Sequence, residues 1–436
     1  MRSERKFNTV LGFYMPSMFH LHVHTINDFS RWKEWDDTTL CTFLHEYIHF
    51  LQDISTVSGL YNIYVLGECL ADHVNKIYSM PDGTVNVPLE ILPDVNNVLN
   101  NKELSELLEG EIEINGIDAC SFQVTGRAEF SENFLKYNGQ VLSVPKVYVP
   151  YDGGGCFLLG NYHISESMAY LGEMIVYGNA SGVVEPSPNY PYDVVRQLAS
   201  FYSSQLASNI PLLFSLCDLS LTFSHSGKAL IGFFIIYVDK GCPSDWQSFV
   251  VDLRNNLKVV GLNSVSSYSD GLCQIRDLAI QSLDKRFNHF TYDDIRRWYY
   301  NIICRAIEMR LQNPLFIYDF LSGGELKHNK WFEHLLKGIG TPVISNDLYN
   351  SFFTTKVNGC ALKKRRAEFL IAAGSITYAL GYGYFPCELR KICRAENRCI
   401  DKNCVRAPWK HARKVSPCPY GHLWYGWALK NKELES

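Results

Sequence analysis

The chain has 436 residues, of which 47% are apolar and 20% are charged, and its formal net charge is -4. This composition can bury a large core, which excludes a disordered chain and predicts two or three domains. No signal peptide is visible, and the uncharged stretches 197–217 and 369–387 are too polar to predict a membrane span. We therefore expect a soluble cytoplasmic protein, whose 14 cysteines are reduced thiols or metal ligands rather than disulfides.

The first predicted element is a short sheet within residues 6–30. Apolar and polar residues alternate over residues 19–25, which predicts a strand with His20, His22 and His24 on one face. Three imidazoles on one face could bind a metal ion, and they are the main rival to the motif that follows. The alternative is a strand beside a cleft, with its polar face toward solvent or substrate.

The next predicted element is a helix from Thr38 to Ser58. Asp36 and Asp37 are residue types that cap a helix N-terminus, and Gly59 stands beyond the expected end. Apolar residues recur at helical spacing and predict one buried face, formed by Leu40, Phe43, Leu44, Tyr47, Ile48, Leu51 and Ile54. Another side of this helix carries the motif that indicates a catalytic function.

That motif is His45-Glu46-Tyr47-Ile48-His49. Two imidazoles one helical turn apart can hold a zinc ion, and the glutamate between them can reach its water. The alternative is a pair of partly buried histidines that only fill the core. At these residues the chain resembles the zincin metallopeptidases, and the resemblance implies that His45 and His49 bind zinc while Glu46 is the general base.

Several downstream carboxylates could supply the third ligand. No glycine and third histidine follow His49 as in metzincins, so the chain resembles the gluzincins, in which a downstream glutamate completes the site. Glu68 has a spacing similar to the gluzincin aminopeptidases, but its segment indicates a structural helix. Glu166 opens Glu-Ser-Met-Ala, which is similar to the second zinc helix of several intracellular HExxH proteins, and Ser165 is the expected cap of that helix. We expect Glu166 to be the third ligand; the alternatives are Glu68, Glu173, Asp218 or no third protein ligand.

The segments after the motif mix strands and helices. Residues 80–150 predict a β-rich insertion with an acidic helix at 97–113. From residue 192 the patterns are mostly helical, over 193–207, 211–223, 244–257, 292–311 and 329–337. Asp218 is expected to be either paired in the core or an orienting partner of a zinc histidine. Tyr162, His163 or Tyr170 could donate to an oxyanion, because they are close to Glu166 in sequence.

The C-terminal end is basic and rich in cysteine. Residues 363–414 hold thirteen Lys or Arg against four acidic residues, a local charge of +9. Such a segment could meet nucleic acid or an acidic partner, and the alternative is a solvated surface whose charge offsets nearby thiolates. A structural zinc site is a further option, although the spacings lack tight pairs, among Cys387, Cys393, Cys399, Cys404 and Cys418.

These patterns predict an α+β fold with a zincin-like catalytic domain that holds the HExxH helix and a small sheet. A largely helical region and a Cys-rich C-terminal end follow, with boundaries expected at 1–230, 231–345 and 346–436. We expect a zinc-dependent hydrolase, an intracellular endopeptidase acting on protein or peptide substrates. Zinc held by His45, His49 and Glu166 would carry the water that Glu46 deprotonates. The alternatives are a zinc-binding regulatory protein with idle chemistry, and a nucleic-acid binder that uses the basic C-terminal end.

Overall fold

The protein is described here from a computed structural model. The structure describes residues 11–16, 18–91, 98–114, 118–137, 140–178, 183, 188–256, 258–260, 265–349, 352–354, 356 and 361–435. Within these residues it is a mixed α/β protein in which helices predominate and the sheets are small. No described helix is long and apolar enough to cross a membrane.

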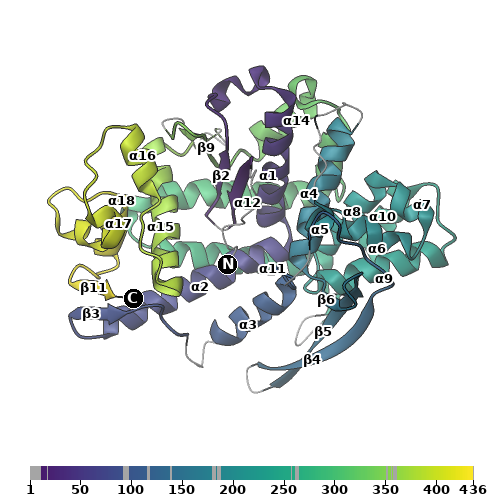
Figure 1. The fold of residues 1–436 in the computed structure, drawn as a ribbon, viewed down its shortest axis with the longest axis horizontal. Coiled ribbons are helices and arrows are strands. Elements are labelled where there is room, and N and C mark those ends of the chain that lie inside the picture. Colours follow the sequence, from purple (N-terminus) through teal and green to yellow (C-terminus); the bar gives the residue numbers. More distant parts are fainter. Residues whose placement is uncertain are drawn as a thin grey trace.

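Long helices cross the middle of the molecule (Figure 1). α1 (Asp37–Ser55) contacts α2 (Val57–Ser79), α4 (Asn161–Tyr177) and α12 (Asp293–Gln312), and α2 packs along α11 (Tyr268–Arg286). These neighbours bury 14 of the 19 residues of α1. A polar side chain on such a helix needs a partner, because burial without one is costly. The residues that contact the histidines of α1 therefore indicate the role of this helix.

A four-stranded sheet lies beside α1. Its order is β1-β2-β9-β10, with β2 and β9 parallel and the other two pairs antiparallel. The strands are β1 (Gly12–Met15), β2 (His20–Val23), β9 (Val343–Ser345) and β10 (Phe352–Phe353). Tyr14 and Leu21 face each other across β1 and β2, and the Tyr14 hydroxyl donates to Asp53 of α1 at 2.8 Å. Phe13 and His22 therefore share the opposite face of the sheet.

A second group of elements lies on the right of Figure 1, next to α4, with the β4–β5 hairpin below it. Its helices are α5 (Asn189–Tyr192), α6 (Val194–Ser200), α7 (Ser204–Ser208), α8 (Ile210–Ser220), α9 (Ser226–Asp239) and α10 (Trp246–Asn256). Its strands are β4 (Glu129–Tyr137), β5 (Gln140–Pro150) and β6 (Cys156–Leu158), and α3 (Val98–Glu109) lies between them and α2.

The C-terminal elements occupy the left end of Figure 1. They are α15 (Lys364–Tyr382), α16 (Leu389–Ala395), α17 (Asn403–Arg406), the 3-10 helix η4 (Pro408–Arg413), α18 (Pro419–Gly426) and β11 (Lys432–Glu435). β11 pairs in parallel with β3 (Gly83–Asn86). The remaining elements are α13 (Phe316–Leu321), α14 (Lys330–Gly338), β7 (Lys258–Val260), β8 (Val265–Ser267) and the 3-10 turns Phe29–Glu34, Phe290–Tyr292 and Leu326–His328.

Several predicted helix boundaries are wrong. The helix expected to run to Ser58 ends at Ser55, because Thr56 is extended and its side chain accepts the Gly59 amide to cap α2. The helix that carries Glu166 begins four residues before Ser165, at Asn161. The helix predicted over 193–207 is two helices, α6 and α7, and the one predicted over 97–113 ends at Glu109 of α3. The other predicted helices overlap α8, α10, α12 and α14. The expected division into three segments stays a prediction.

Candidate metal centre

The helix α1 carries the first two residues of the site. Its start is fixed by Asp36, whose carboxylate accepts the Thr39 amide at 2.8 Å. His45 and His49 lie one turn apart on this helix, and both are buried, with 9% and 5% of their surfaces exposed. The expected pairing of the two imidazoles on one face is confirmed.

The helix α4 supplies a carboxylate to the same place. Glu166 is 2% exposed, and one of its oxygens lies 3.4 Å from His45 Nε2 and 3.5 Å from His49 Nε2. α1 and α4 approach closely at Gly172, where a Cβ atom would lie only 2.4 Å from Ile48 Cδ1. The two nitrogens and the carboxylate oxygen lie within 4.8 Å of one another and could hold a metal ion.

The other ring nitrogen of each histidine has its own acceptor. His45 Nδ1 lies 2.6 Å from Glu173 Oε1, and His49 Nδ1 lies 2.8 Å from Gln52 Oε1. The Gln52 amide is oriented in turn, because its Nε2 donates to the Ser165 carbonyl oxygen at 3.1 Å. Both imidazoles can therefore carry their proton on Nδ1 and point an Nε2 lone pair toward Glu166.

The charge around His45 is strongly negative. Burial alone would lower the pKa of His45, but the carboxylates of Glu173, Glu166 and Glu46 outweigh it and raise that pKa to about 10. The centre therefore attracts a positive charge, which a proton or a metal ion can supply.

Glu46 lies on the sheet side of the same helix. It is half-buried, and its Cγ atom is 3.5 Å from the position that a Cβ atom would take at Gly12 of β1. β1 is the terminal strand of its sheet among the described strands. The glutamate between the two histidines therefore faces the strand at the edge of the sheet.

His163, one of the three residues expected to donate to an oxyanion, forms hydrogen bonds in the core through both ring nitrogens. Tyr190 donates its hydroxyl proton to the Glu111 carbonyl oxygen at 2.5 Å and accepts from His163 Nε2 at 2.9 Å. His163 Nδ1 accepts the Gly160 amide at 3.3 Å, so both ring nitrogens are used, and burial lowers the pKa of His163 to about 3. His163 is a neutral core residue, and its expected oxyanion role is wrong.

A tyrosine that sequence reasoning missed lies at the site. The ring of Tyr192 contacts the ring of His45 at 5.7 Å between centroids, and Tyr170 packs against Tyr192 at 6.2 Å. Tyr162 is 3% exposed and its ring contacts His163. Tyr192 follows a turn recognisable in the sequence, but its distance from the motif along the chain concealed its position.

Two other acidic candidates lie elsewhere. Glu68 forms an ion pair with Lys285 at 2.7 Å, between α2 and α11. Asp218 binds Arg310 through both oxygens, at 2.7 and 3.0 Å, and Arg310 also donates to Ser55. The structure brings neither carboxylate to the histidine pair. Of the two roles open for Asp218, the paired core acid is confirmed, and Glu173 occupies the orienting position instead.

The histidines of β2 form a separate cluster. Ser345 Oγ lies 2.8 Å from His20 Nε2 and 2.9 Å from His22 Nδ1, and Asp347 lies 3.3 Å from His22 and 2.8 Å from His24. His22, His24 and Asp347 could also hold a metal ion, but His24 and Asp347 are exposed. Burial lowers the pKa of His20 to about 3, so His20 is held neutral. The expected three-imidazole site is therefore reduced to two histidines and an aspartate.

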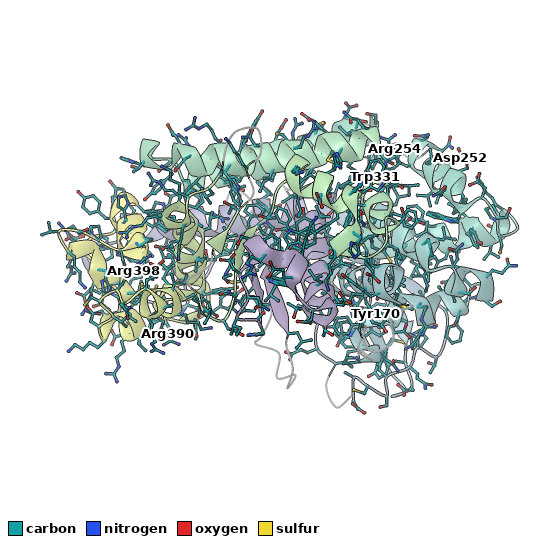
Figure 2. The ribbon with its side chains drawn as sticks, turned by 90° about the horizontal axis from the view of Figure 1, so that it is seen from above. Tyr170, Asp252, Arg254, Trp331, Arg390 and Arg398 are labelled. Atoms are coloured by element: carbon teal, nitrogen blue, oxygen red, sulfur yellow. The ribbon has the colours of Figure 1, made fainter. Side chains whose placement is uncertain are left out.

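The basic C-terminal segment is rich in ion pairs. Figure 2 shows Arg390 and Arg398 at this end of the molecule, opposite the half that holds Tyr170. The pairs are Lys364 with Glu396, Arg366 with Asp294, Lys391 with Glu388, Arg398 with Glu368, Lys410 and Arg413 with Glu433, and Lys414 with Asp401. Carboxylates thus offset much of the local positive charge, and binding of nucleic acid stays a prediction.

Comparison with known proteins gives no match: no family model fits the chain, and no curated protein or solved structure is significantly similar to it. The likeness to zincins thus depends on the residues of the site alone.

Proposed function

We propose that the protein is a zinc-dependent hydrolase, an endopeptidase of the gluzincin type. One observation carries the proposal: His45 and His49 direct Nε2 toward one oxygen of Glu166 while their Nδ1 atoms are held by Glu173 and Gln52. Two imidazoles and a carboxylate, with a fourth position left open, are a donor set of catalytic zinc sites.

The distances support a tetrahedral metal. Ligand atoms that lie about 2.1 Å from one ion in tetrahedral directions are about 3.4 Å apart. The separations of Glu166 from His45 and His49 are 3.4 and 3.5 Å. These are long for hydrogen bonds between nitrogen and oxygen, whereas the outer contacts to Glu173 and Gln52, at 2.6 and 2.8 Å, have the usual length.

The chain's own residues provide the rest of the chemistry. When bound, the metal ion would supply Lewis acidity, which lowers the pKa of a water molecule and polarises a carbonyl group. Glu46 would accept the proton of the attacking water and pass it to the leaving amine. Tyr192, whose ring contacts His45, is our candidate donor to the developing oxyanion.

A peptide substrate is supported by the edge strand. No described strand pairs with the outer edge of β1, and β1 passes beside Glu46. An extended peptide can add to such an edge through its main-chain hydrogen bonds. A peptide bound there would place a carbonyl near Glu46, which suits an endopeptidase better than an enzyme for small molecules.

The test compares wild type with Glu46→Gln. The amide cannot accept a proton, so cleavage should fall by roughly 10²–10⁴-fold while zinc content is unchanged. Glu103→Gln changes an exposed helical glutamate of α3 in the same way and is the matched control. Purified proteins would be analysed for zinc, and new peptide termini would be counted in a proteome digest. Equal cleavage by Glu46→Gln would exclude the mechanism, and zinc-loaded wild type that produces no new termini would exclude a peptidase.

A further inference from the structure

A second group of metal-ligating side chains lies beside α17, at the C-terminal end of the molecule (Figure 1). Asp401 precedes α17, Cys404 lies within it and His411 lies in η4. One ligand atom of each residue lies within 4.8 Å of the ligand atoms of the other two. Among the cysteines that the structure describes, only Cys404 belongs to such a group. One of the five candidate cysteines thus lies beside an aspartate and a histidine rather than beside other thiols.

The three side chains meet at one ring nitrogen. His411 Nε2 lies 3.2 Å from Asp401 Oδ1 and 3.6 Å from Cys404 Sγ, and that sulfur lies 3.8 Å from the same Oδ1. A ring nitrogen carries at most one proton, so Nε2 cannot donate fully to both neighbours. A catalytic triad would place the thiol and the carboxylate on opposite nitrogens of the ring, and this group places both on Nε2. Three donor atoms that face one another in this way are the arrangement expected around a shared ion.

The distances agree with tetrahedral zinc. Zinc lies about 2.0–2.2 Å from nitrogen and oxygen ligands and about 2.3 Å from sulfur, so tetrahedral directions place nitrogen and oxygen about 3.4 Å apart and sulfur about 3.6 Å from either. The separations found here are 3.2 Å for nitrogen and oxygen, 3.6 Å for sulfur and nitrogen, and 3.8 Å for sulfur and oxygen, within about 0.2 Å of those values. The contact of 3.2 Å alone would suit a hydrogen bond, but the two sulfur distances agree with the same central point.

Neighbouring groups hold the ligands in place. The Asn403 amide donates to Asp401 Oδ1 at 2.9 Å, and Lys414 Nζ donates to Asp401 Oδ2 at 3.0 Å. His411 is 5% exposed, and α18 packs on its backbone, because a Cβ atom at Gly421 would lie 2.6 Å from the His411 carbonyl carbon. Ligands that are already oriented lose less conformational freedom when they bind, which favours binding.

We propose that Asp401, Cys404 and His411 bind one zinc ion that holds α17 and η4 together. These helices span four and six residues, and elements of this length are marginal alone. On binding, the Cys404 thiol releases its proton to solvent, His411 keeps its proton on Nδ1 and binds through Nε2, and Asp401 binds as the carboxylate. A water molecule would take the fourth position on the ion. This site has no part in hydrolysis and does not depend on the function proposed above.

The first test measures sulfur coordination in the full chain. Wild type loaded with cobalt in place of zinc should show the near-ultraviolet band of sulfur-to-metal charge transfer. The α1–α4 centre contributes nothing to this band, because its proposed ligands contain no sulfur. Cys404→Ser should remove the band, whereas Cys399→Ser changes an exposed cysteine of the same segment and should keep it. Cobalt-loaded wild type without the band would overturn the proposal, as would an intact band in Cys404→Ser or an equal loss in Cys399→Ser.

The second test identifies the other two ligands by titrating the same cobalt band. Asp401→Asn and His411→Gln should each weaken binding by more than the roughly 10–100-fold that loss of an outer partner of a metal-binding histidine causes. His422→Gln changes a histidine of α18 that contacts Tyr292 and should leave the titration unchanged. Wild-type affinity in Asp401→Asn or His411→Gln would show that the ligand set is wrong.

A third measurement needs no variant and therefore does not depend on how a variant folds. Wild type would be alkylated with and without zinc, and the labelling of each cysteine would be followed by mass spectrometry. Zinc should slow the labelling of Cys404 at least tenfold and leave the exposed Cys399 at its original rate. Equal labelling of Cys404 under both conditions would overturn the proposal.

Discussion

Gln52 offers the sharpest test of the metal centre, because Gln52 is uncharged and replacing it with another uncharged residue leaves the net charge of the site unchanged. It is buried in α1 and bridges His49 Nδ1, at 2.8 Å, and the Ser165 carbonyl of α4, at 3.1 Å. Gln52→Leu has a similar size but removes both hydrogen bonds, together with the weaker contact of Gln52 Nε2 with the Met168 sulfur at 3.2 Å. The imidazole then loses the contact that fixes its proton on Nδ1 and its Nε2 toward Glu166.

The expected magnitude follows from these two contacts. Loss of an outer partner of a metal-binding histidine typically lowers metal affinity 10–100-fold, which corresponds to about 1.4–2.7 kcal/mol. The fold itself should lose a further 1–3 kcal/mol or so for each buried group left without a partner. Zinc affinity would be measured by competition with a chelator, and stability by denaturant unfolding of the metal-free protein.

A matched control separates the two effects. Gln197 also bridges buried groups, accepting the Val124 amide at 2.8 Å and donating to Asp193 at 3.2 Å, but it does not contact the histidine pair. Gln197→Leu should lower stability and leave zinc affinity at the wild-type level. Unchanged zinc affinity in Gln52→Leu would refute the reasoning, as would an equal loss in both variants.

Three further outcomes are expected. Glu166→Ala should abolish tight zinc binding at the histidine pair, whereas Glu68→Ala should change stability by under about 0.5 kcal/mol and leave that zinc bound; the reverse result in parallel metal titrations would move the third ligand to α2. His163 has a folded pKa of about 3 against an ordinary value of 6.5, so the unfolded chain takes up its proton first as pH falls. Its contribution is complete above pH 6.5 and is lost toward pH 3 at about 1.4 kcal/mol per pH unit; His163→Gln should flatten the unfolding free energy in that range, and an unchanged slope would contradict the assignment. Asp218→Ala should cost about 3–5 kcal/mol because it leaves Arg310 buried and unpaired, and adding Arg310→Leu should recover much of this loss; a zinc content that falls in the folded Asp218 variant would speak against a purely structural pair.

The parts of the fold that local pattern encodes could be predicted. α1 shows helical periodicity and a capping aspartate, and its histidine pair follows from spacing alone. The break at Thr56 was missed because one threonine both ends α1 and caps α2, and a threonine at that position is equally compatible with the interior of a single long helix. α15 was missed for a different reason: it is buried on nearly all sides, so it shows no contrast between an apolar and a polar face.

The pairing of distant segments could not be read from the sequence. β2 takes β9 as its neighbour across more than three hundred residues, and β3 takes β11 over a longer interval. Short strands carry little register information, so their partners are set by the packing of the helices around them. Part of the site was nevertheless within reach. Glu173 lies two turns after Glu166 and Gln52 lies one turn after His49, so each shares a helix face with a metal ligand candidate.

A histidine pair in a buried helix has a plain alternative, in which both rings only fill the core. His163 shows what that alternative looks like in this chain: one nitrogen accepts an amide, the other donates to a tyrosine hydroxyl, and the ring is held neutral. His45 and His49 differ in a specific way. Each satisfies one nitrogen at ordinary hydrogen-bond distance and directs the other to an oxygen 3.4 or 3.5 Å away, a separation better suited to two ligands of one ion than to a donor and its acceptor. The histidines of α1 and His163 of α4 lie in one core but differ in how their ring nitrogens are used. This difference favours a metal centre more strongly than the HExxH motif does by itself.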